Sequence, residues 1–367
     1  MKNKKPEMLE LLKEFVNRET PSTSKELLDD FALYLKDFIR GRLGTDCEVI
    51  RAENAGNVLR CVFNGDAKDQ ILLLTHYDTV FEKATINKRP FQVREGRAYG
   101  PGIFDMKGGL VQTLFALEYL IKNNKMKNRL VLLVTSDEEI GSDFSRELIV
   151  DEAKKSKFAF VMEPSLNGNL KTERKGVGTI KLTTHGKAAH AGLDPDKGIN
   201  AIYAMSSIIE QIKVFRKNMN DGTLINVGTI NGGTRSNVVP DFCEIAIDLR
   251  YNDENSAEQV LSFLKSVKTD PSDASATMNY KLREPMIRTK ASAELFENVK
   301  LQAQSIDLNV GEVSVSGGSD GNICSKYCPV IDGLGAVGDG AHSESEYLVV
   351  DTLPERSALL CLVFNIQ

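Results

Sequence analysis

Short apolar runs alternate with amphipathic helical segments through the first half of this chain, and this alternation strongly constrains the fold. Residues 71–75, 130–135 and 158–162 are almost entirely apolar and have the length of strands. Helical periodicity appears between and after them, at 110–121 and 145–154. Strands that are apolar on both faces are typical of a parallel sheet covered by helices. We therefore expect an α/β fold with a mostly parallel sheet flanked by helices.

The pattern changes near residue 176. An alternating strand, a long helix, two further strands, a helix and a last strand follow in order, which is the split βαβ arrangement of a ferredoxin-like α+β domain. After Pro285 the chain returns to helix and strand patterns and ends on a helical segment. We predict a catalytic domain formed by residues 1–175 and 288–367, and an inserted lid or dimerisation domain formed by residues 176–287.

Charge and hydropathy exclude two classes of partner. The formal net charge is −5 and Lys and Arg form no cluster, so we expect no nucleic-acid partner. No run of 18 apolar residues occurs, so we expect no membrane partner either. The Lys-rich start leads into an amphipathic run from Leu9 to Val16, which indicates a first helix rather than a signal peptide.

The six cysteines are scattered, and only Cys324 and Cys328 are close in sequence. We expect free buried thiols in a reducing cytoplasm, with a zinc or disulfide site as the alternative. The predicted location is cytoplasmic.

Polar residues follow directly on the predicted strands. His76 and Asp78 follow the first buried strand, Asp137, Glu138 and Glu139 follow the second, and Glu163 closes the third. Ligands of an open α/β sheet bind outside the carboxyl ends of its strands, so these groups are expected at one edge. Asp105 lies in the loop between the first two strands and can reach the same place.

Each of these residues has an ordinary structural explanation. Asp105 and Asp137 can be turn or cap residues, Glu138 and Glu139 can form a solvated turn, and His76 can be a core histidine. Together, however, several carboxylates without Lys or Arg would repel one another, and a bound divalent metal would remove that repulsion.

The ligand types favour zinc. Histidine nitrogen combined with carboxylate oxygen suits Zn²⁺, with Co²⁺ or Mn²⁺ as substitutes. No H-E-x-x-H motif is present, which argues against a single-zinc thermolysin-like site. A further histidine is available at His342, in a Gly-rich segment, and another at His190, in the predicted inserted domain.

Nine separated segments resemble metallopeptidase family 20, the dizinc group of glutamate carboxypeptidases, aminoacylases and desuccinylases. In order they are HYDTV (76–80), YGPG (99–102), DMKGG (105–109), TSDEEIGS (135–142), EPS (163–165), GKAAHAG (186–192), SNVVP (236–240), GGSD (317–320) and AHS (341–343). The branch that this chain resembles most is the carboxypeptidase G type, which releases C-terminal glutamate.

The resemblance implies two zinc ions per subunit. Asp105 would bridge them, His76 and Glu163 would complete one site, and Glu139 and His342 the other. Glu138 would be the general base, and Asp78 would accept from the ring N–H of His76. The family also leads us to expect a cis peptide bond after Asp105.

The resemblance further implies roles in the inserted domain. His190 would reach the active site of a partner subunit and stabilise the developing oxyanion, which implies a homodimer through the lid. Asn237 would lie beside the same carbonyl. The substrate carboxylate would meet Arg250 and the backbone N–H groups of Gly317, Gly318 and Ser319, although a solvated strand-end charge is an equal alternative for Arg250.

Two details bear on the substrate. Glu163, where aminopeptidases of the family tend to carry Asp, favours a carboxypeptidase or deacylase. Lys171 matches a basic residue near the pocket, but Glu284 stands where glutamate carboxypeptidases place an Arg, with Arg283 one position earlier. Cleavage next to a free carboxylate is therefore better supported than a strict preference for glutamate.

We expect zinc-dependent hydrolysis of a peptide or N-acyl amide bond next to a free carboxylate, releasing a C-terminal amino acid such as glutamate. One alternative is a biosynthetic N-acyl amino acid deacylase or desuccinylase, which would share every metal residue. The other is an inactive homologue that binds metal or peptide, against which the presence of Glu138 argues.

Overall fold

The computed structural model describes all of residues 1–367, which divide into two compact units. Unit 1 comprises Met1–Glu173, Arg288–Ser314 and Ser319–Gln367. Unit 2 comprises Arg174–Ile287 together with Val315–Gly318. The catalytic role of unit 1 and the lid role of unit 2 stay predictions.

Unit 1 contains a six-stranded sheet in the order β1-β2-β6-β3-β7-β16. The strands are β1 (Cys47–Ile50), β2 (Val58–Phe63), β3 (Gln70–His76), β6 (Arg129–Thr135), β7 (Phe158–Val161) and β16 (Val330–Ile331). Strands β6, β3, β7 and β16 run parallel, and β1 and β2 add an antiparallel edge. Every side chain of β3 is buried, as expected for a strand covered on both faces. The predicted α/β fold with a mostly parallel sheet is confirmed.

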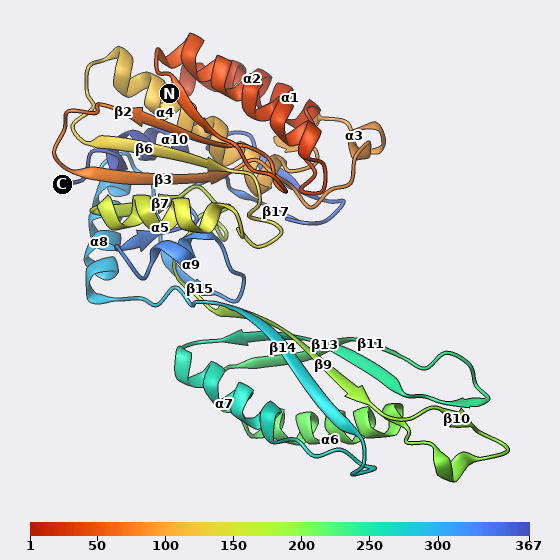
Figure 1. The fold of residues 1–367 in the computed structure, drawn as a ribbon. Helices are drawn as coiled ribbons and strands as arrows, with labels where there is room; N and C mark the ends of the chain where they lie inside the picture. Colours follow the sequence, from red (N-terminus) through yellow and green to blue (C-terminus); the bar gives the residue numbers. More distant parts are fainter. The chain divides into compact units, whose positions relative to one another are not determined.

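Helices cover both faces of this sheet (Figure 1). They are α1 (Lys5–Asn17), α2 (Lys25–Leu43), α4 (Gly108–Lys122), α5 (Ser145–Lys155), α8 (Lys290–Gln304), α9 (Asp320–Cys324) and α10 (Thr352–Val363). The short helix α3 (Thr85–Lys88) lies between β3 and α4 along the chain. Helix α4 packs on the sheet beneath α1, α2 and α10, which explains why it is apolar nearly all round. Helices α5 and α9 pack on the other face.

Two small sheets complete unit 1. One has the order β17-β18-β5-β4 and the other pairs β15 with β8. Their strands are β4 (Gln92–Arg94), β5 (Arg97–Tyr99), β8 (Leu170–Arg174), β15 (Glu312–Val315), β17 (Gly338–Asp339) and β18 (Tyr347–Val349).

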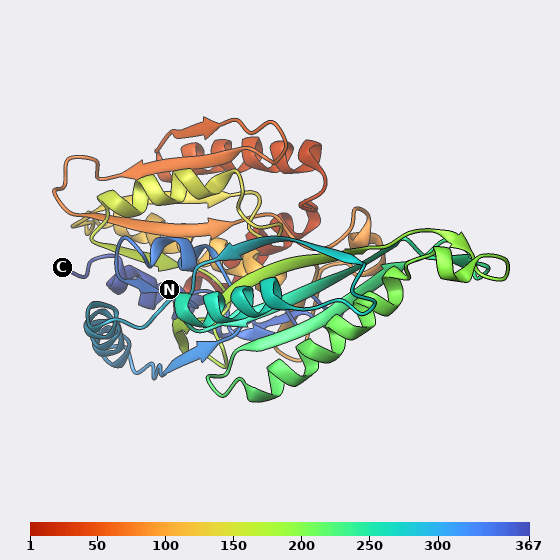
Figure 2. The ribbon, with the colours of Figure 1, turned by 60° about the horizontal axis from the view of Figure 1, so that its bottom comes forward.

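Unit 2 contains a four-stranded antiparallel sheet in the order β11-β13-β9-β14. In chain order its elements are β9 (Gly176–His185), α6 (Ala201–Asn218), β11 (Leu224–Gly232), β13 (Phe242–Tyr251), α7 (Glu254–Ser266) and β14 (Ser275–Arg283). A two-stranded ribbon of β10 (Ala189–His190) and β12 (Val238–Val239) extends from it. Both helices lie on one face of the sheet (Figure 2), where they enclose a separate apolar core. This βαββαβ order is the predicted split arrangement.

The expectation of free thiols is wrong for two of the six cysteines. Cys47 and Cys61 are directly opposite each other on β1 and β2, with Cα atoms 4.4 Å apart, and form a disulfide. The sequence pattern revealed neither strand, so their pairing was not foreseen. The other four cysteines are buried free thiols, as expected.

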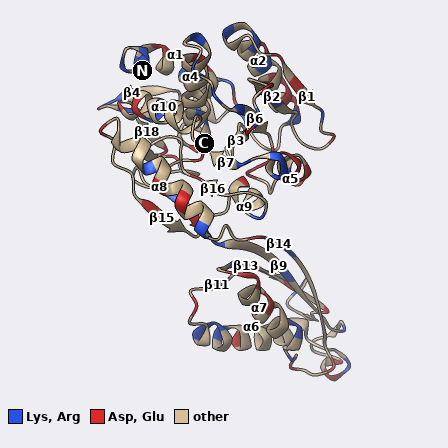
Figure 3. Cartoon of the chain, turned by 90° about the vertical axis from the view of Figure 1, so that its left-hand side faces the viewer, with Lys and Arg blue, Asp and Glu red and all other residues tan.

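No helix is long and apolar enough to cross a membrane. Charges of both signs occur together along helices such as α8 (Figure 3). The cytoplasmic location stays a prediction.

Candidate metal centre

The three central strands of unit 1 end at the same edge of the sheet. In the parallel register, His76 at the end of β3 lies opposite Thr135 at the end of β6, and Leu74 lies opposite Val161 of β7. The segments that carry Asp78, Glu138–Glu139 and Glu163 therefore leave the sheet side by side.

Two loops bring the remaining ligand candidates to this edge. Asp105 lies in a single π-turn, Ile103–Lys107, directly before α4. His342 lies in the loop between β17 and β18, and its φ of +63° is in the left-handed region. The peptide bond between Asp105 and Met106 is cis, which confirms that expectation.

The two histidines face different oxygens of Asp105. His76 Nε2 lies 3.3 Å from Asp105 Oδ1 and 3.2 Å from Glu163 Oε1. His342 Nε2 lies 3.4 Å from Asp105 Oδ2 and 3.1 Å from Glu139 Oε2. The cluster thus consists of two groups of ligand atoms that share one carboxylate, which is the arrangement of a two-metal site with a bridging Asp.

Two buried carboxylate oxygens in the cluster lack a hydrogen-bond partner. They are Asp105 Oδ1 and Glu139 Oε1. Burying an ionised carboxylate is costly unless its oxygens are paired or coordinate a metal. Further, one ligand atom each from His76, Glu138 and Glu163 lie within 4.8 Å of one another, and so do those of His76, Asp105 and Glu139. These residues therefore fit the binding of divalent metal.

The charges of the cluster are strongly coupled. Burial opposes protonation of His76, but the neighbouring carboxylates of Asp105, Asp78 and Glu163 outweigh it and raise the pKa of this imidazole. Asp105 and Glu139 raise the pKa of His342 to about 11. The carboxylates of this cluster therefore favour positive charge at both imidazoles.

Glu138, the predicted general base, lies next to this cluster. Burial, with the charges of Glu163 and Asp320, raises its pKa well above the ordinary value. A raised pKa makes a carboxylate a stronger base toward a bound water.

The loop that carries Glu138 and Glu139 is fixed from several sides. Asp137 accepts the backbone N–H of Phe144 at 2.8 Å. Asp320, from the C-terminal part of the chain, accepts hydroxyl hydrogen bonds from Thr135 at 3.1 Å and from Ser142 at 2.5 Å. The loop is therefore held rigidly at the end of β6, as a site on a fixed scaffold requires.

Glu346 is a buried residue near this site that the sequence analysis missed. Its carboxylate accepts backbone N–H groups from the segment that contains Asp105. Its position four residues after His342 was the available signal, but an exposed-looking Ser- and Glu-rich segment gave no reason to expect burial.

Unit 2 carries the predicted substrate-contacting residues His190, Asn237 and Arg250. His190, in β10, is paired with Val238 of β12, which directly follows Asn237, and Ala191 N–H donates to the Asn237 carbonyl. The ribbon thus brings His190 and Asn237 together. Arg250 lies at the end of β13, where its guanidinium forms a two-point ion pair with Asp248 at 2.9 and 3.0 Å.

The remaining predicted substrate contacts lie on two other segments, and except for the Ser319 N–H the groups predicted to meet the substrate are not those in the bonds below. The carbonyls of Gly317 and Gly318 accept from Arg174 at 2.9 and 3.0 Å. Ser319 N–H donates to Asn322 Oδ1 at 3.0 Å, because Ser319 caps α9, so this N–H is not available to a substrate. Lys171, on β8, pairs through its backbone with Asp332.

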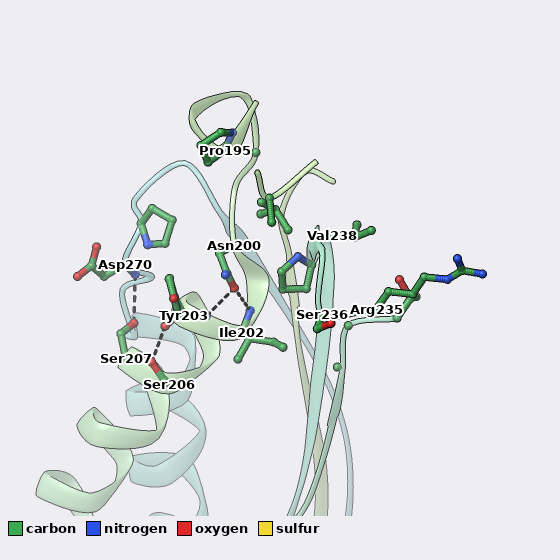
Figure 4. A pocket seen from close by; sticks show the side chains of 18 residues that line it. Pro195, Asn200, Ile202, Tyr203, Ser206, Ser207, Arg235, Ser236, Val238 and Asp270 are labelled. Carbon is green, nitrogen blue, oxygen red and sulfur yellow. Dashed lines mark hydrogen bonds between the residues drawn. The ribbon is translucent and has the colours of Figure 1, made fainter. Parts of the chain in front are cut away.

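A cavity of about 1050 Å³ lies in unit 2 rather than at the charged cluster (Figure 4). It lies between the start of α6, where Asn200 accepts from Ile202 and Tyr203, and the segment from Gly232 to Pro240. None of its lining residues belongs to the candidate metal cluster, so its volume does not define the reaction site.

A parallel sheet with this set of ligands at its carboxyl edge defines a class of metal-dependent hydrolases. Within that class, a sequence model described as peptidase family M20/M25/M40 matches residues 72–365, and the chain belongs to this family. Family members generally bind metal ions, typically zinc.

Two relatives with assigned activities cover most of the chain. Carboxypeptidase G2 from Pseudomonas sp. (strain RS-16) is 29% identical over 371 residues, which cover 96% of this chain and 88% of the relative. Succinyl-diaminopimelate desuccinylase from Rickettsia felis is 28% identical over 335 residues, which cover 83% of this chain and 84% of the relative.

Solved structures share the fold. The M20 family metallo-carboxypeptidase Sso-CP2 from Sulfolobus solfataricus matches with a TM-score of 0.80 at 19% identity, covering 98% of both chains. The aminopeptidase PepT from Bacillus cereus matches with a TM-score of 0.78 at 21% identity, also covering 98% of both chains.

Proposed function

We propose that this protein is a two-zinc amidohydrolase that cleaves a peptide or N-acyl amide bond next to a free carboxylate and releases a C-terminal amino acid, such as glutamate. The observation that carries the proposal is the shared carboxylate of Asp105, whose two oxygens face His76 and His342 separately. Co²⁺ or Mn²⁺ can substitute for zinc at ligands of this type.

The residues divide into two sets around Asp105. His76 and Glu163 would hold one ion and Glu139 and His342 the other, with Asp105 bridging them. Bound zinc ions supply a polarised substrate carbonyl and a water of lowered pKa. Glu138 takes a proton from the attacking water and transfers it to the leaving nitrogen.

His190 is suited to donate a hydrogen bond to the oxyanion. Its Nδ1 accepts the backbone N–H groups of Gly192 and Leu193, each at 3.1 Å. Because an accepting Nδ1 carries no proton, the neutral ring carries its proton on Nε2. Donors fixed in advance toward a developing negative charge are strong contributors to catalysis. Asn237 joins His190 on the same ribbon.

Arg250 is the proposed anchor for the substrate carboxylate. Its planar guanidinium is already held in place by Asp248, and a substrate carboxylate would either share or replace that partner. Lys171 is a second basic candidate.

We also propose a homodimer formed through unit 2. Strand β11 is an edge strand, and Ile230 on it is 59% exposed. Exposed apolar edge strands are normally covered by another chain or protected by charge. Analytical ultracentrifugation of Ile230→Lys should give monomer, whereas Leu301→Lys, equally exposed on α8 of unit 1, should leave a dimer. A monomeric unmodified protein would contradict this part of the proposal.

A biosynthetic deacylase is the second candidate, because a succinyl-diaminopimelate desuccinylase is similar over 83% of the chain. Zinc-loaded protein should be tested for amino-acid release from peptides with free and amidated C-termini, from N-acyl amino acids and from N-succinyl amino compounds. The carboxypeptidase proposal expects cleavage of free peptides and protection by amidation. Cleavage of N-acyl or N-succinyl compounds alone would favour the deacylase.

The variant Glu138→Gln provides the chemical control. It should retain bound zinc and lose on the order of 10²–10⁴-fold in kcat, because the general base is removed while the proposed ligands stay. Full activity in this variant would contradict the assigned base, and absence of zinc binding in the unmodified protein would contradict the proposed function as a whole.

A further inference from the structure

We propose that Glu346 is a positioning residue for the metal centre: it fixes the backbone of the Asp105 segment to the loop that carries His342. This inference rests on the proposed two-metal function, but it assigns a role to a residue that would not itself bind metal. Both ligand-bearing segments meet at this one buried carboxylate.

Both carboxylate oxygens of Glu346 accept hydrogen bonds, three in all, from backbone N–H groups. Oε2 accepts the backbone N–H of Gly102 at 2.8 Å. Oε1 accepts the backbone N–H groups of Phe104 at 2.9 Å and Asp105 at 3.0 Å. The side chain is fully buried, so these donors replace water as the partners of the carboxylate.

The Asp105 segment needs such an acceptor because its backbone is irregular. Two backbone bonds close it, from Lys107 N–H to the Gly102 carbonyl at 3.0 Å and from Gly108 N–H to the Ile103 carbonyl, and Asp105 has the non-helical angles φ −113° and ψ 97°. Buried N–H groups outside a regular helix or sheet must find another partner. Glu346 supplies that partner to three of them, including the N–H of the proposed bridging ligand itself.

The other end of the connection is the loop of His342. Glu346 directly precedes β18, which pairs with both β17 and β5. Its own N–H donates to the Ser343 carbonyl at 3.3 Å, next to His342. The position of Glu346 is therefore set by the same hairpin that sets His342. Glu346 therefore links the segment of Asp105 to the loop of His342, whose Nε2 lies 3.4 Å from Asp105 Oδ2.

This geometry predicts how metal binding depends on Glu346. Replacing the carboxylate by an amide turns one acceptor oxygen into an N–H₂ group that faces an N–H donor, so at least one buried N–H loses its partner. The Asp105 backbone would then shift or loosen, and both proposed metal sites include Asp105. Loss of an outer partner of this kind costs about 10–100-fold in metal affinity.

The test is zinc affinity, measured by competition with a chromogenic chelator on metal-free protein. Glu346→Gln should bind zinc about 10–100-fold more weakly than the unmodified protein. Glu344→Gln is the matched control, because it removes the same charge two residues away at an exposed position, and it should bind zinc normally. If Glu346→Gln does not fold, as judged by circular dichroism, Glu346→Asp takes its place with the same expectation, since its shorter side chain cannot span the same donors.

A second measurement separates positioning from general destabilisation. In an Asp105→Asn background, adding Glu346→Gln should change zinc affinity by less than about 3-fold, because residues that act through one another are not additive. The same fold-loss in both backgrounds would overturn the inference, as would normal zinc binding by the single variant. Absence of zinc binding by the unmodified protein would instead overturn the proposed function.

Discussion

The carboxylate of Asp78 accepts the backbone N–H of Glu139 at 3.1 Å and, on its other oxygen, that of Glu138 at 3.2 Å. It also accepts from Ser22 Oγ at 2.9 Å. His76 Nδ1 lies 3.3 Å from Asp78 Oδ1 and closer, 3.0 Å, to the Asp78 carbonyl oxygen. Asp78 thus holds the proposed ligand His76 and the proposed base in one orientation.

Asp78→Ala should therefore weaken zinc binding and lower kcat, each by about 10–100-fold. Metal content by atomic absorption and steady-state kinetics would measure the two effects. Asp30→Ala, which removes an exposed carboxylate of α2, serves as the charge control and should match the unmodified protein. Normal kinetics for Asp78→Ala would show that the loop is held sufficiently by its other bonds.

His190→Ala should lower kcat by about 10²–10³-fold while leaving zinc content unchanged, because it removes a hydrogen-bond donor and no proposed ligand. His185→Ala is the matched control: His185 is exposed at the end of β9, where its Nε2 lies 3.3 Å from Thr277 Oγ1. Loss of zinc from His190→Ala would contradict the assigned role, and so would an unchanged kcat.

Removing the metal should destabilise the fold of unit 1. Zinc at 100 times its dissociation constant contributes about 2.7 kcal/mol to the free energy of unfolding. A chelator should therefore lower Tm by roughly 5–10 °C, and added Zn²⁺ should restore it. Calorimetry with Mg²⁺ as the control ion would check the selectivity. If metal-free and zinc-loaded protein unfold at the same temperature, zinc does not stabilise the fold by binding to the buried carboxylates.

Two glycines should respond to alanine in opposite directions. A Cβ at Gly109, in the first turn of α4, would lie 2.1 Å from the Met162 carbonyl oxygen, next to the proposed ligand Glu163. A Cβ at Gly41, in the last turn of α2, would meet nothing within 4 Å. Gly41→Ala should raise the free energy of unfolding by about 0.5–1 kcal/mol, because alanine favours a helix more than glycine does. Gly109→Ala should lower the free energy of unfolding by about 1–3 kcal/mol, because the backbone at Met162 or at α4 must move to make room for the Cβ.

Urea unfolding would measure both variants on the same scale. Stabilisation of Gly109→Ala would mean that α4 can shift away from Met162 without cost. In that case the close approach of this helix to the Glu163 segment is not a constraint on the site.

Local patterns were sufficient for the three central strands of the sheet and for most ligand candidates. The apolar runs that became β3, β6 and β7 could only be covered strands, and polar residues directly after parallel strands must share an edge. The roles of Asp105, His342 and the lid residues were assigned through motif resemblance, since the loops that carry them have no periodicity. Their roles stay predictions.

The sequence by itself thus determined the α/β class, the strand and helix order after residue 176 and the residue types of the candidate metal cluster, because burial periodicity and chain order encode these directly. Only the tertiary structure decided which oxygen of Asp105 faces which histidine, that Cys47 pairs with Cys61, and that Glu346 is buried beneath the Asp105 segment. Each of these depends on contacts between segments distant in sequence or outside the recognised strands. The free energy of such contacts depends on distance and burial in space, which no local pattern records.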